Sequence, residues 1–276
     1  MHGAGNDYIY ISPADEYKQY DWSELSVTMS DRHTGIGSDG IILALPSERA
    51  DLKMRMFNAD GSEGKMCGNG IRCLVSFAID ESIIEPDHSP VSVETQSGIL
   101  TVYPNIEEGK MISAQVSMGS PGLTAASIPV TINGLDKISD YPLRIAGEEY
   151  KINCVSMGNP HAVAFLDTPV EDIPLDKIGP IVENHEIFPE GVNFEIVNII
   201  DRKHVKVRVW ERGSGLTLAC GTGACAVAVS AHLHKYIDDD VVVTLPGGDL
   251  LIRWPGSGNV VMEGPVDKVF EGEWTK

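Results

Sequence analysis

The sequence has few cysteines, little positive charge and no long apolar run, and each shortage argues against a class of protein. Five cysteines among 276 residues, an odd number, do not suit a framework of structural disulfides. Lysine and arginine total 21 against 40 acidic residues, a net charge of −19 that disfavours nucleic acid and anionic membranes as partners. No run could span a membrane, and the opening MHGAGNDYIYI lacks the pattern of a signal peptide. We therefore expect a cytoplasmic protein that binds neither nucleic acid nor membranes.

The spacing of the cysteines also argues against a metal site. Cys67 and Cys73 are six residues apart, and Cys220 and Cys225 are five apart, so neither pair has the CxxC spacing of a zinc site. We expect no metal. Cys73, Cys154 and Cys225 are interpreted as small buried apolar residues.

The most informative feature that is present is an internal repeat. MRMFNADGSEGKMC (54–67) and VRVWERGSGLTLAC (207–220) each begin as an alternating strand and pass through a glycine-containing turn to a cysteine. Three pairs of positions share the offset 220 − 67 = 153: Cys67 and Cys220, Asn6 and Asn159, and Gly40 and Asn193. One ungapped offset for three motifs predicts two domains of the same design.

We place these domains at residues 1–113 with the tail 265–276, and at residues 114–264. Apolar residues at helical spacing follow the first cysteine motif, and GTGACAVAVSAHL after the second is apolar on almost every side. Strands are expected at 91–95, 99–103, 128–132, 241–245 and 260–263. The predicted fold is α/β (α+β), with two pseudo-symmetric domains, each of strands wrapped around a central buried helix.

The repeat also predicts a strand that the first half does not contain. KINCVSM precedes Gly158 and reads as a strand, but its counterpart at the offset of 153 would lie mostly upstream of Met1. We therefore expect the natural start to lie several residues earlier.

Cys67 and Cys220 each stand where a helix is expected to begin. Backbone N–H groups and the helix dipole favour an anion there, which predicts a lowered thiol pKa. The glycines of CGNG and CGTG allow close approach of backbone to a ligand. Two such thiols on opposite sides of an amino-acid α-carbon suit removal of a proton from one face and its return on the other, without a cofactor lysine. A redox pair is the alternative for the same two thiols.

The motif blocks together resemble the diaminopimelate epimerase family. The blocks are MHGAGNDY, MRMFNADGSEGKMCGNGIRC, MGNPHAV, GVNFEIV and RVWERGSGLTLACGTGACA, in that order over nearly the whole chain. The resemblance implies two pseudo-symmetric α/β domains, a homodimer, and neither pyridoxal phosphate nor any other cofactor nor a metal. It implies interconversion of LL- and meso-2,6-diaminopimelate on the route to lysine and peptidoglycan.

The resemblance also assigns roles to individual residues. Cys67 and Cys220 would be the acid/base thiols, with His161 and Glu211 setting thiol protonation and holding the α-amino group. The reacting α-carboxylate would be held by Gly68, Asn69, Gly221 and Thr222. The rest of the substrate would be bound by Asn6, Asn58, Asn159, Asn193 and Arg212, whose guanidinium suits the distal carboxylate. Gly40 departs from the pattern, because many members carry glutamine there.

Two other functions remain open from the sequence. A related cofactor-independent racemase for proline-like substrates would share the fold and the cysteines. Its substrate is a cyclic monocarboxylate, however, so it would not need residues such as Arg212 to bind a distal carboxylate. An amino-acid-binding or scaffold protein without activity would not need both Cys-Gly-x-Gly turns. Fast alkylation of a thiol near neutral pH, with protection by substrate, distinguishes an enzyme from a scaffold.

Overall fold

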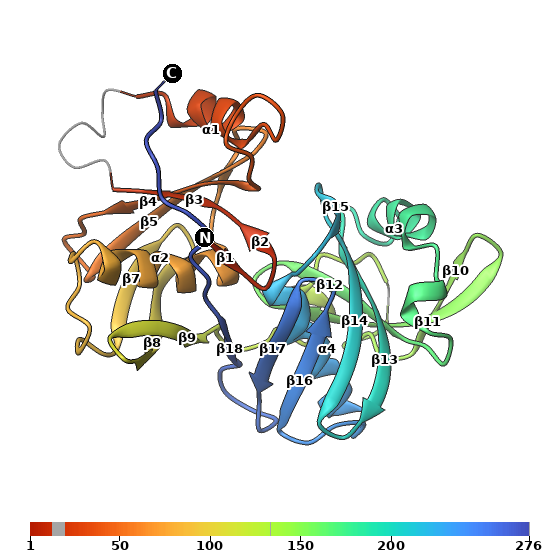
Figure 1. Cartoon of the computed structure of the whole chain (residues 1–276). Helices are drawn as coiled ribbons and strands as arrows, with labels where there is room; N and C mark the ends of the chain where they lie inside the picture. The colour runs from red at the N-terminus through yellow and green to blue at the C-terminus, as the bar shows by residue number, and fades with distance from the viewer. Residues whose placement is uncertain (13–19, 133, 276) are drawn as a thin grey trace. The chain divides into compact units, whose positions relative to one another are not determined.

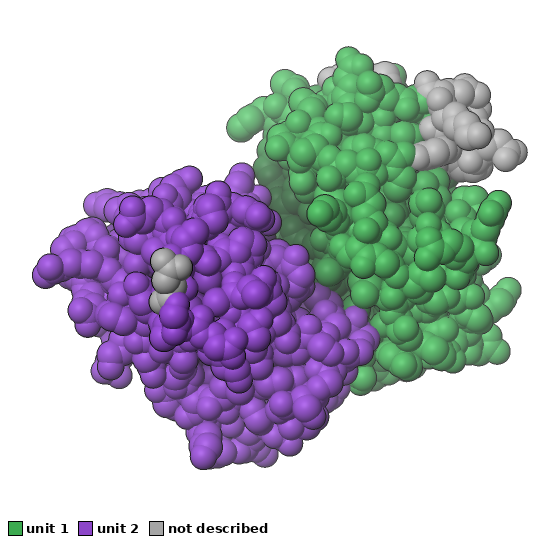
Figure 2. All heavy atoms as spheres, turned by 180° about the vertical axis from the view of Figure 1, so that it is seen from behind, with its two compact units in different colours: residues 1–116, 263–276 green, residues 117–262 purple. Residues whose placement is uncertain are grey.

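The computed structural model describes residues 1–12, 20–132 and 134–275. The chain divides into two compact units, residues 1–116 with 263–276 (unit 1) and residues 117–262 (unit 2), coloured separately in Figure 2. The domain limits proposed from the sequence differ from these by 116 − 113 = 3 residues and 264 − 262 = 2 residues. None of the helices in the described part of the chain combines the length and the apolar character that crossing a bilayer requires.

In the part of unit 1 that the structure describes, a mixed sheet is accompanied by two helices (Figure 1). Its strands are β1 (His2–Gly3), β2 (Asn6–Asp7), β3 (Ile9–Ile11), β4 (Gly40–Leu45), β5 (Leu52–Asn58), β6 (Glu63–Gly64), β7 (Val91–Thr95), β8 (Gly98–Glu107) and β9 (Lys110–Ser117). Its helices are α1 (Trp22–Ser30) and α2 (Gly68–Asp80). The sheet order is β9-β8-β7-β5-β4-β3, with β6 beside β5, and β1 pairs with β2 separately. Helix α2 packs against β1, β2, β4 and β8.

Unit 2 repeats this design on a larger scale. Its strands are β10 (Tyr141–Ile145), β11 (Glu148–Ser156), β12 (Pro160–Phe165), β13 (Asn193–Asp201), β14 (His204–Glu211), β15 (Gly215–Thr217), β16 (Asp240–Leu245) and β17 (Gly248–Arg253), and β18 (Val261–Pro265) contains the boundary with unit 1. Its helices are α3 (Leu175–Glu183) and α4 (Gly221–Leu233), with short 3-10 helices η2 (Ala125–Ser127) and η3 (Val170–Asp172). The sheet order is β10-β11-β12-β13-β14-β16-β17, with β15 beside β14.

The two units have the same strand registers. Helices α2 and α4 both have 13 residues, and their first residues differ by 221 − 68 = 153. β3 is parallel to β4 as β12 is to β13, and β5 is parallel to β7 as β14 is to β16. After the helices the offset falls to 248 − 98 = 150, since β8 and β17 begin at Gly98 and Gly248. The repeat therefore extends through each unit, with three fewer residues after the second helix.

Helix α4 is the buried helix that its sequence predicts. Every residue from Gly223 to Ala231 is buried, and the helix packs against β11, β12, β13, β16 and β17. Glycine, alanine, valine and cysteine leave the helix narrow enough for strands to surround it. This packing fixes the first turn of α4 against the unit 2 sheet, and with it the position of the N-cap residue Cys220.

The strand expected at 128–132 is wrong. Ile128 follows η2 and is buried in the unit 2 core, and Pro129 has no N–H for a strand ladder. Thr131 donates its backbone N–H to Ile187 O at 3.0 Å, a single bond and not a ladder. The other four expected strands are confirmed as β7, β8, β16 and β18.

Candidate active site

Each of the two singled-out cysteines is the N-cap of a helix. Cys67 Sγ accepts the backbone N–H of Gly70 at 3.3 Å, and Cys220 Sγ accepts that of Gly223 at 3.4 Å. An N-cap normally uses a side-chain oxygen for this bond. Here the acceptor is sulfur, so a thiolate at either position would meet the positive end of a helix.

A side chain at the third helical position would crowd a side chain of the strand behind it in both units. A Cβ at Gly70 would lie 2.5 Å from Ile42 Cδ1, and one at Gly223 would lie 2.8 Å from Glu195 Oε1. Each helix start therefore packs directly on a strand behind it, β4 or β13. This contact holds the amide at hydrogen-bond distance from the sulfur.

In unit 1, the Cys67 thiol is held by an asparagine that is itself held by a carboxylate. Cys67 Sγ donates to Asn6 Oδ1 at 3.1 Å, and Asn6 Nδ2 donates to Asp39 Oδ2 at 2.7 Å. Arg32 bridges the carboxylates of Asp39 and Asp7. Burial raises the pKa of Asp39, and the neighbouring charge of Asp7 raises it further. The amide of Asn6 is thus oriented with its oxygen toward the thiol.

A buried arginine fixes the first turn of α2. The Arg72 side chain is 0% exposed; its Nη1 donates to Gly68 O and its Nη2 to Asn69 Oδ1, both at 3.1 Å. A charge buried this deeply is stable only when its N–H groups have acceptors. Gly68 and Asn69 are therefore held in one conformation by Arg72.

In unit 2, a hydrogen-bonded series leads from Cys220 to a histidine. Thr222 Oγ1 lies 3.5 Å from Cys220 Sγ and accepts from Asn159 Nδ2 at 3.2 Å. Asn159 Oδ1 lies 3.1 Å from His161 Nε2. His161 is on β12, Thr222 is the second residue of α4, and Asn159 lies in the turn before β12. Three of the residues that the resemblance singles out are thus brought together with Cys220.

Glu211 is the single carboxylate among the site residues expected from the sequence, and it interacts with the Cys220 thiol. It ends β14, its Oε1 accepts the hydroxyl of Thr217, and it hydrogen-bonds Cys220. Burial raises the pKa of the Glu211 carboxyl, although these hydrogen bonds and the charge of His161 oppose the shift. A carboxyl with a raised pKa beside a thiol is suited to exchange a proton with that thiol, here Cys220.

The expected low pKa of the Cys220 thiol is wrong. Burial raises the pKa of Cys220 well above its ordinary value, and the carboxylates of Glu211 and Glu195 raise it further. The hydrogen bonds from Thr222 and Gly223 act in the other direction but are outweighed. Desolvation and two negative neighbours exceed the effect of one helix start. The helix start alone therefore does not lower the pKa of the Cys220 thiol.

Of the five residues expected to bind the rest of the substrate, Asn6 and Asn159 contact the thiol networks described above, and the other three lie in two places. Asn193 Oδ1 accepts the backbone N–H of Arg212 at 3.0 Å, and Asn193 Nδ2 donates to Pro160 O at 2.8 Å. The exposed Arg212 side chain donates to Glu190 O at 2.9 Å. Asn193 and Arg212 therefore belong with Glu211 in unit 2, whereas Asn58 in unit 1 donates to Ser62 Oγ at 3.0 Å.

Gly40 is required by the backbone around it. Its φ is +154°, and a Cβ would lie 2.1 Å from Phe57 O and 3.0 Å from Asn58 Cα. The glutamine that many family members carry has no room here unless the β4–β5 pair moves apart. Asn58 pairs with Gly40 across these strands. The counterpart of Asn58 in unit 2 is Glu211, at the offset 211 − 58 = 153.

We expect Gly40→Gln to destabilise unit 1 by at least about 2 kcal/mol, because it adds a backbone clash to an unfavourable φ. Gly109→Gln is the matched control: Gly109 also has a positive φ, +79°, but nothing lies within 4 Å of its Cβ position. Its cost should be about 1 kcal/mol. Urea unfolding of both variants measures the difference. Equal costs would show that the β4–β5 pair accepts a side chain at position 40.

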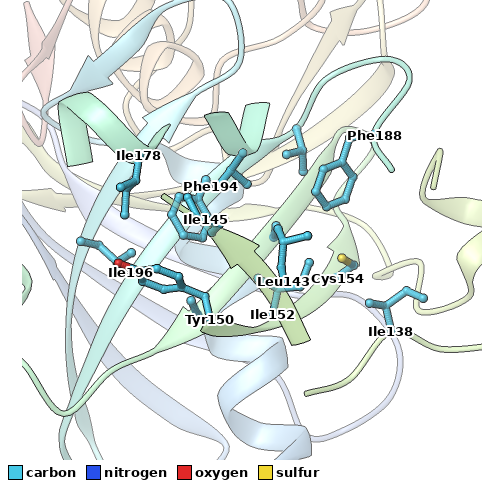
Figure 3. Close-up of a cluster of buried hydrophobic side chains, with 14 of the residues drawn as sticks. Ile138, Leu143, Ile145, Tyr150, Ile152, Cys154, Ile178, Phe188, Phe194 and Ile196 are labelled. Carbon is cyan, nitrogen blue, oxygen red and sulfur yellow. The ribbon is translucent and has the colours of Figure 1, made fainter. Parts of the chain in front are cut away.

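The three remaining cysteines lie in the core, as expected. Cys73 and Cys225 are 0% exposed, and Cys154 lies in the unit 2 hydrophobic cluster beside Ile138 and Ile152 (Figure 3). Burial raises the pKa values of Cys73 and Cys154, which makes both poor nucleophiles at neutral pH. Among the residues that the structure describes, no group of three or more histidine, cysteine or acidic side chains could hold a metal ion.

The sequence did not predict three charged residues that hydrogen-bond to the site residues. They are Asp39, Arg72 and Glu195. A signal for two of them exists: Glu195 interrupts the apolar stretch NFEIV, and Arg72 interrupts the apolar helix face of GIRCLV. A charge inside a buried element needs a partner, and the partner often belongs to a site.

Solved structures of racemases and epimerases share the fold. A probable proline racemase from Agrobacterium radiobacter K84 superposes with a TM-score of 0.68 at 15% identity, covering 96% of this chain and 88% of that one. A hydroxyproline epimerase from Agrobacterium vitis gives 0.66 at 16% identity, covering 96% and 86%. At this identity the likeness shows the fold alone. The chain therefore has the fold of these proteins, and in this chain a cysteine caps the central helix of each unit.

Sequence comparison narrows the class to one family. The family model described as Diaminopimelate epimerase matches residues 1–124 and 153–269. The diaminopimelate epimerases of Acetivibrio thermocellus and Methanococcus maripaludis strain C5 are each 49% identical over 274 residues, covering 99% of this chain and 96% and 97% of the relatives. That of Bacillus licheniformis is 47% identical over 277 residues. The chain belongs to the diaminopimelate epimerase family and is therefore an isomerase.

Proposed function

We propose that the protein interconverts LL- and meso-2,6-diaminopimelate by a two-thiol mechanism, as a step of lysine biosynthesis that also supplies peptidoglycan precursors. The observation that carries the proposal is the pair of cysteine N-caps at matching positions of a repeated unit, Cys67 and Cys220. The relatives named diaminopimelate epimerase, which match nearly the whole chain, support the choice of substrate.

The proposed chemistry moves one proton on each face of the α-carbon. One cysteine, as thiolate, takes the α-proton, so that a C–H bond breaks and an S–H bond forms. The other cysteine, as thiol, gives its proton to the opposite face, and its S–H bond becomes the new C–H bond. The two sulfurs exchange protonation states in each turnover, and the reverse reaction uses them in the opposite roles.

The carbanion between these two steps requires stabilisation of the reacting carboxylate. We assign this task to the backbone N–H groups at the starts of the two helices. The residues are Gly68 and Asn69 of α2 with Gly221 and Thr222 of α4. Oriented N–H groups away from bulk water stabilise developing negative charge most strongly. Glu211 and His161 are assigned to thiol protonation and the α-amino group, since both lie within the Cys220 hydrogen-bond network.

The other end of the substrate is assigned to the polar residues around these helix starts. They are Asn6, Asn58, Asn159, Asn193 and Arg212. The exposed Arg212 guanidinium supports recognition of a distal carboxylate, because its planar donor set matches that group. A homodimer in the cytoplasm, and a reaction without metal or cofactor, complete the proposal by analogy with the family.

Incubation with purified LL-diaminopimelate tests the proposal, with the stereoisomers separated by chiral chromatography. We expect the LL and meso isomers to reach the same final ratio from either starting material, in reducing buffer and with no added cofactor. L-proline and trans-4-hydroxy-L-proline, as separate substrates, should remain unchanged. Inversion of proline with unchanged diaminopimelate would instead identify a proline-type racemase, and no reaction with any of them would favour a binding protein.

A further inference from the structure

The fully buried carboxylate of Glu195 lies close enough to the Cys220 thiol to affect its pKa. Glu195 and His161 are both 0% exposed, and Glu195 Oε1 lies 2.7 Å from His161 Nδ1. Glu195 Oε2 has no hydrogen-bond partner within the described residues. Glu195 comes from the interior of β13, where its neighbours Phe194 and Ile196 are also buried. An ionised carboxylate in such a place is stable only beside a positive charge.

The contacts of His161 make its ring the candidate for that positive charge. An ionised carboxylate has no hydrogen to give, so Nδ1 must donate to Glu195. The other ring nitrogen, Nε2, lies 3.1 Å from Asn159 Oδ1, which is also an acceptor. A histidine whose two nitrogens both donate is an imidazolium. The 2.7 Å distance is in the range of charge-assisted hydrogen bonds.

The hydrogen bonds beyond His161 all run in one direction. Because Asn159 Oδ1 accepts from His161, its Nδ2 is free to donate to Thr222 Oγ1, at 3.2 Å. The Thr222 hydroxyl hydrogen then points along the remaining contact, to Cys220 Sγ at 3.5 Å. The sulfur thus receives a donor from this series in addition to the N–H of Gly223 at 3.4 Å.

We propose that Glu195 is a positioning residue that keeps His161 protonated and thereby directs the His161–Asn159–Thr222 hydrogen bonds toward the Cys220 sulfur. The proposal rests on the proposed role of Cys220 as an acid/base thiol and deepens it. Without the Glu195 charge, His161 becomes neutral and its Nε2 becomes an acceptor. The Asn159 amide then turns over, its oxygen accepts the Thr222 hydroxyl, and the sulfur loses a donor.

The charge of Glu195 and the hydrogen-bond direction that it sets have opposite effects on the pKa of Cys220, so removing Glu195 distinguishes them. The ionisable groups that face Cys220 are Glu211 from β14, Glu195 from β13 and, through the series, His161 from β12. Cys154 of β11 faces Glu195. The charge of Glu195 by itself raises the pKa of Cys220, so its simple removal should lower that pKa. Reversal of the hydrogen-bond direction should raise it.

The experiment compares the full-length protein with Glu195→Gln by two methods that need no substrate. Nitrogen-15 NMR reports the protonation of the His161 ring, and the pH profile of iodoacetamide alkylation, followed on the Cys220 peptide by mass spectrometry, reports the thiol. In the wild type we expect both ring nitrogens to carry a proton, because each faces an acceptor. In the variant we expect a neutral ring at neutral pH and an alkylation profile about one pH unit higher.

Three further variants locate the effect. Glu195→Asp keeps the charge and should keep the ring protonated. Thr222→Val removes only the last donor, so it should raise the alkylation profile and leave the ring protonated. Cys154→Ala changes the packing beside Glu195 without touching the series, and should move neither signal. Thr222→Val and the wild-type spectrum also test the proposal if Glu195→Gln does not fold.

Two results would overturn the proposal: a neutral His161 ring in the wild type, or an alkylation profile that moves to lower pH in Glu195→Gln. Neither depends on the identity of the substrate. A protein that fails to epimerise diaminopimelate but shows the expected spectra and profiles would refute the proposed function and leave the role of Glu195 standing.

Discussion

Replacing either Cys67 or Cys220 with serine is expected to reduce epimerisation of diaminopimelate by about 10³-fold or more. A serine hydroxyl in the same place is too weak an acid to exist as the oxyanion, so it cannot take the α-proton, and it gives up its own proton far less readily than a thiol. Both directions of the reaction require both groups, so each single variant should fail with LL and with meso substrate. Initial rates in both directions, by chiral chromatography, provide the measurement.

The matched control is Cys73→Ala, which removes a buried sulfur from the same helix as Cys67 without touching its N-cap. This variant should retain turnover within about threefold of the wild type, with some loss of stability from the small cavity. Turnover close to that of the wild type in either Cys67→Ser or Cys220→Ser would rule out a two-thiol mechanism.

Glu211→Gln should lower turnover by about 10²-fold while making Cys220 more reactive. The amide keeps the shape of the side chain and its bond to the Thr217 hydroxyl, so packing is retained. It removes one of the two carboxylate charges that raise the pKa of Cys220, so the alkylation profile of this thiol should move to lower pH. A more reactive thiol in a slower enzyme would show that proton exchange, and not nucleophilicity, limits the reaction.

The same variant has an expected effect on stability, with a definite sign. The folded-state pKa of Glu211 is raised by burial, so the folded protein holds this proton more tightly than the unfolded chain does. The contribution of Glu211 to stability is therefore complete at low pH and is lost as the pH rises through the folded-state pKa. Urea unfolding should show Glu211→Gln gaining stability relative to the wild type above that pKa and not below it. An equal difference at all pH values would mean that Glu211 titrates normally.

The general design could be predicted because it depends on local patterns that occur twice. Cys67 and Cys220 precede apolar helices at one offset, and the structure begins both helices at the next residue. The composition of residues 221–233 indicated a helix buried on all sides, and α4 is buried in this way. Four of five strand positions followed from alternating apolar residues. At 128–132 the pattern failed because Pro129 and a single hydrogen bond to Ile187 leave no ladder.

The electrostatics of the site could not be predicted, because they depend on residues far apart in the sequence. A cysteine before a helix indicated a lowered pKa, but Cys220 is buried near two carboxylates, one of them Glu195 from a different strand. Asp39 is 33 residues from Asn6, and Glu195 is 34 residues from His161. Sequence spacing carries no information on such contacts until the strands are paired. Only the presence of Glu195 within an apolar strand hinted at a buried charge.

Deuterium incorporation during the first part of the reaction tests the two-thiol mechanism most directly. The protein is incubated with LL-diaminopimelate in D₂O under reducing conditions, and the meso product and the remaining LL substrate are examined by proton NMR and mass spectrometry before equilibrium. Thiol protons exchange with solvent, so a second cysteine that delivers the new proton should place deuterium at the inverted carbon of the product while the remaining substrate keeps its α-proton. Product that retains the original α-proton would mean that one base moves the proton between faces, and would contradict the assignment of separate roles to Cys67 and Cys220.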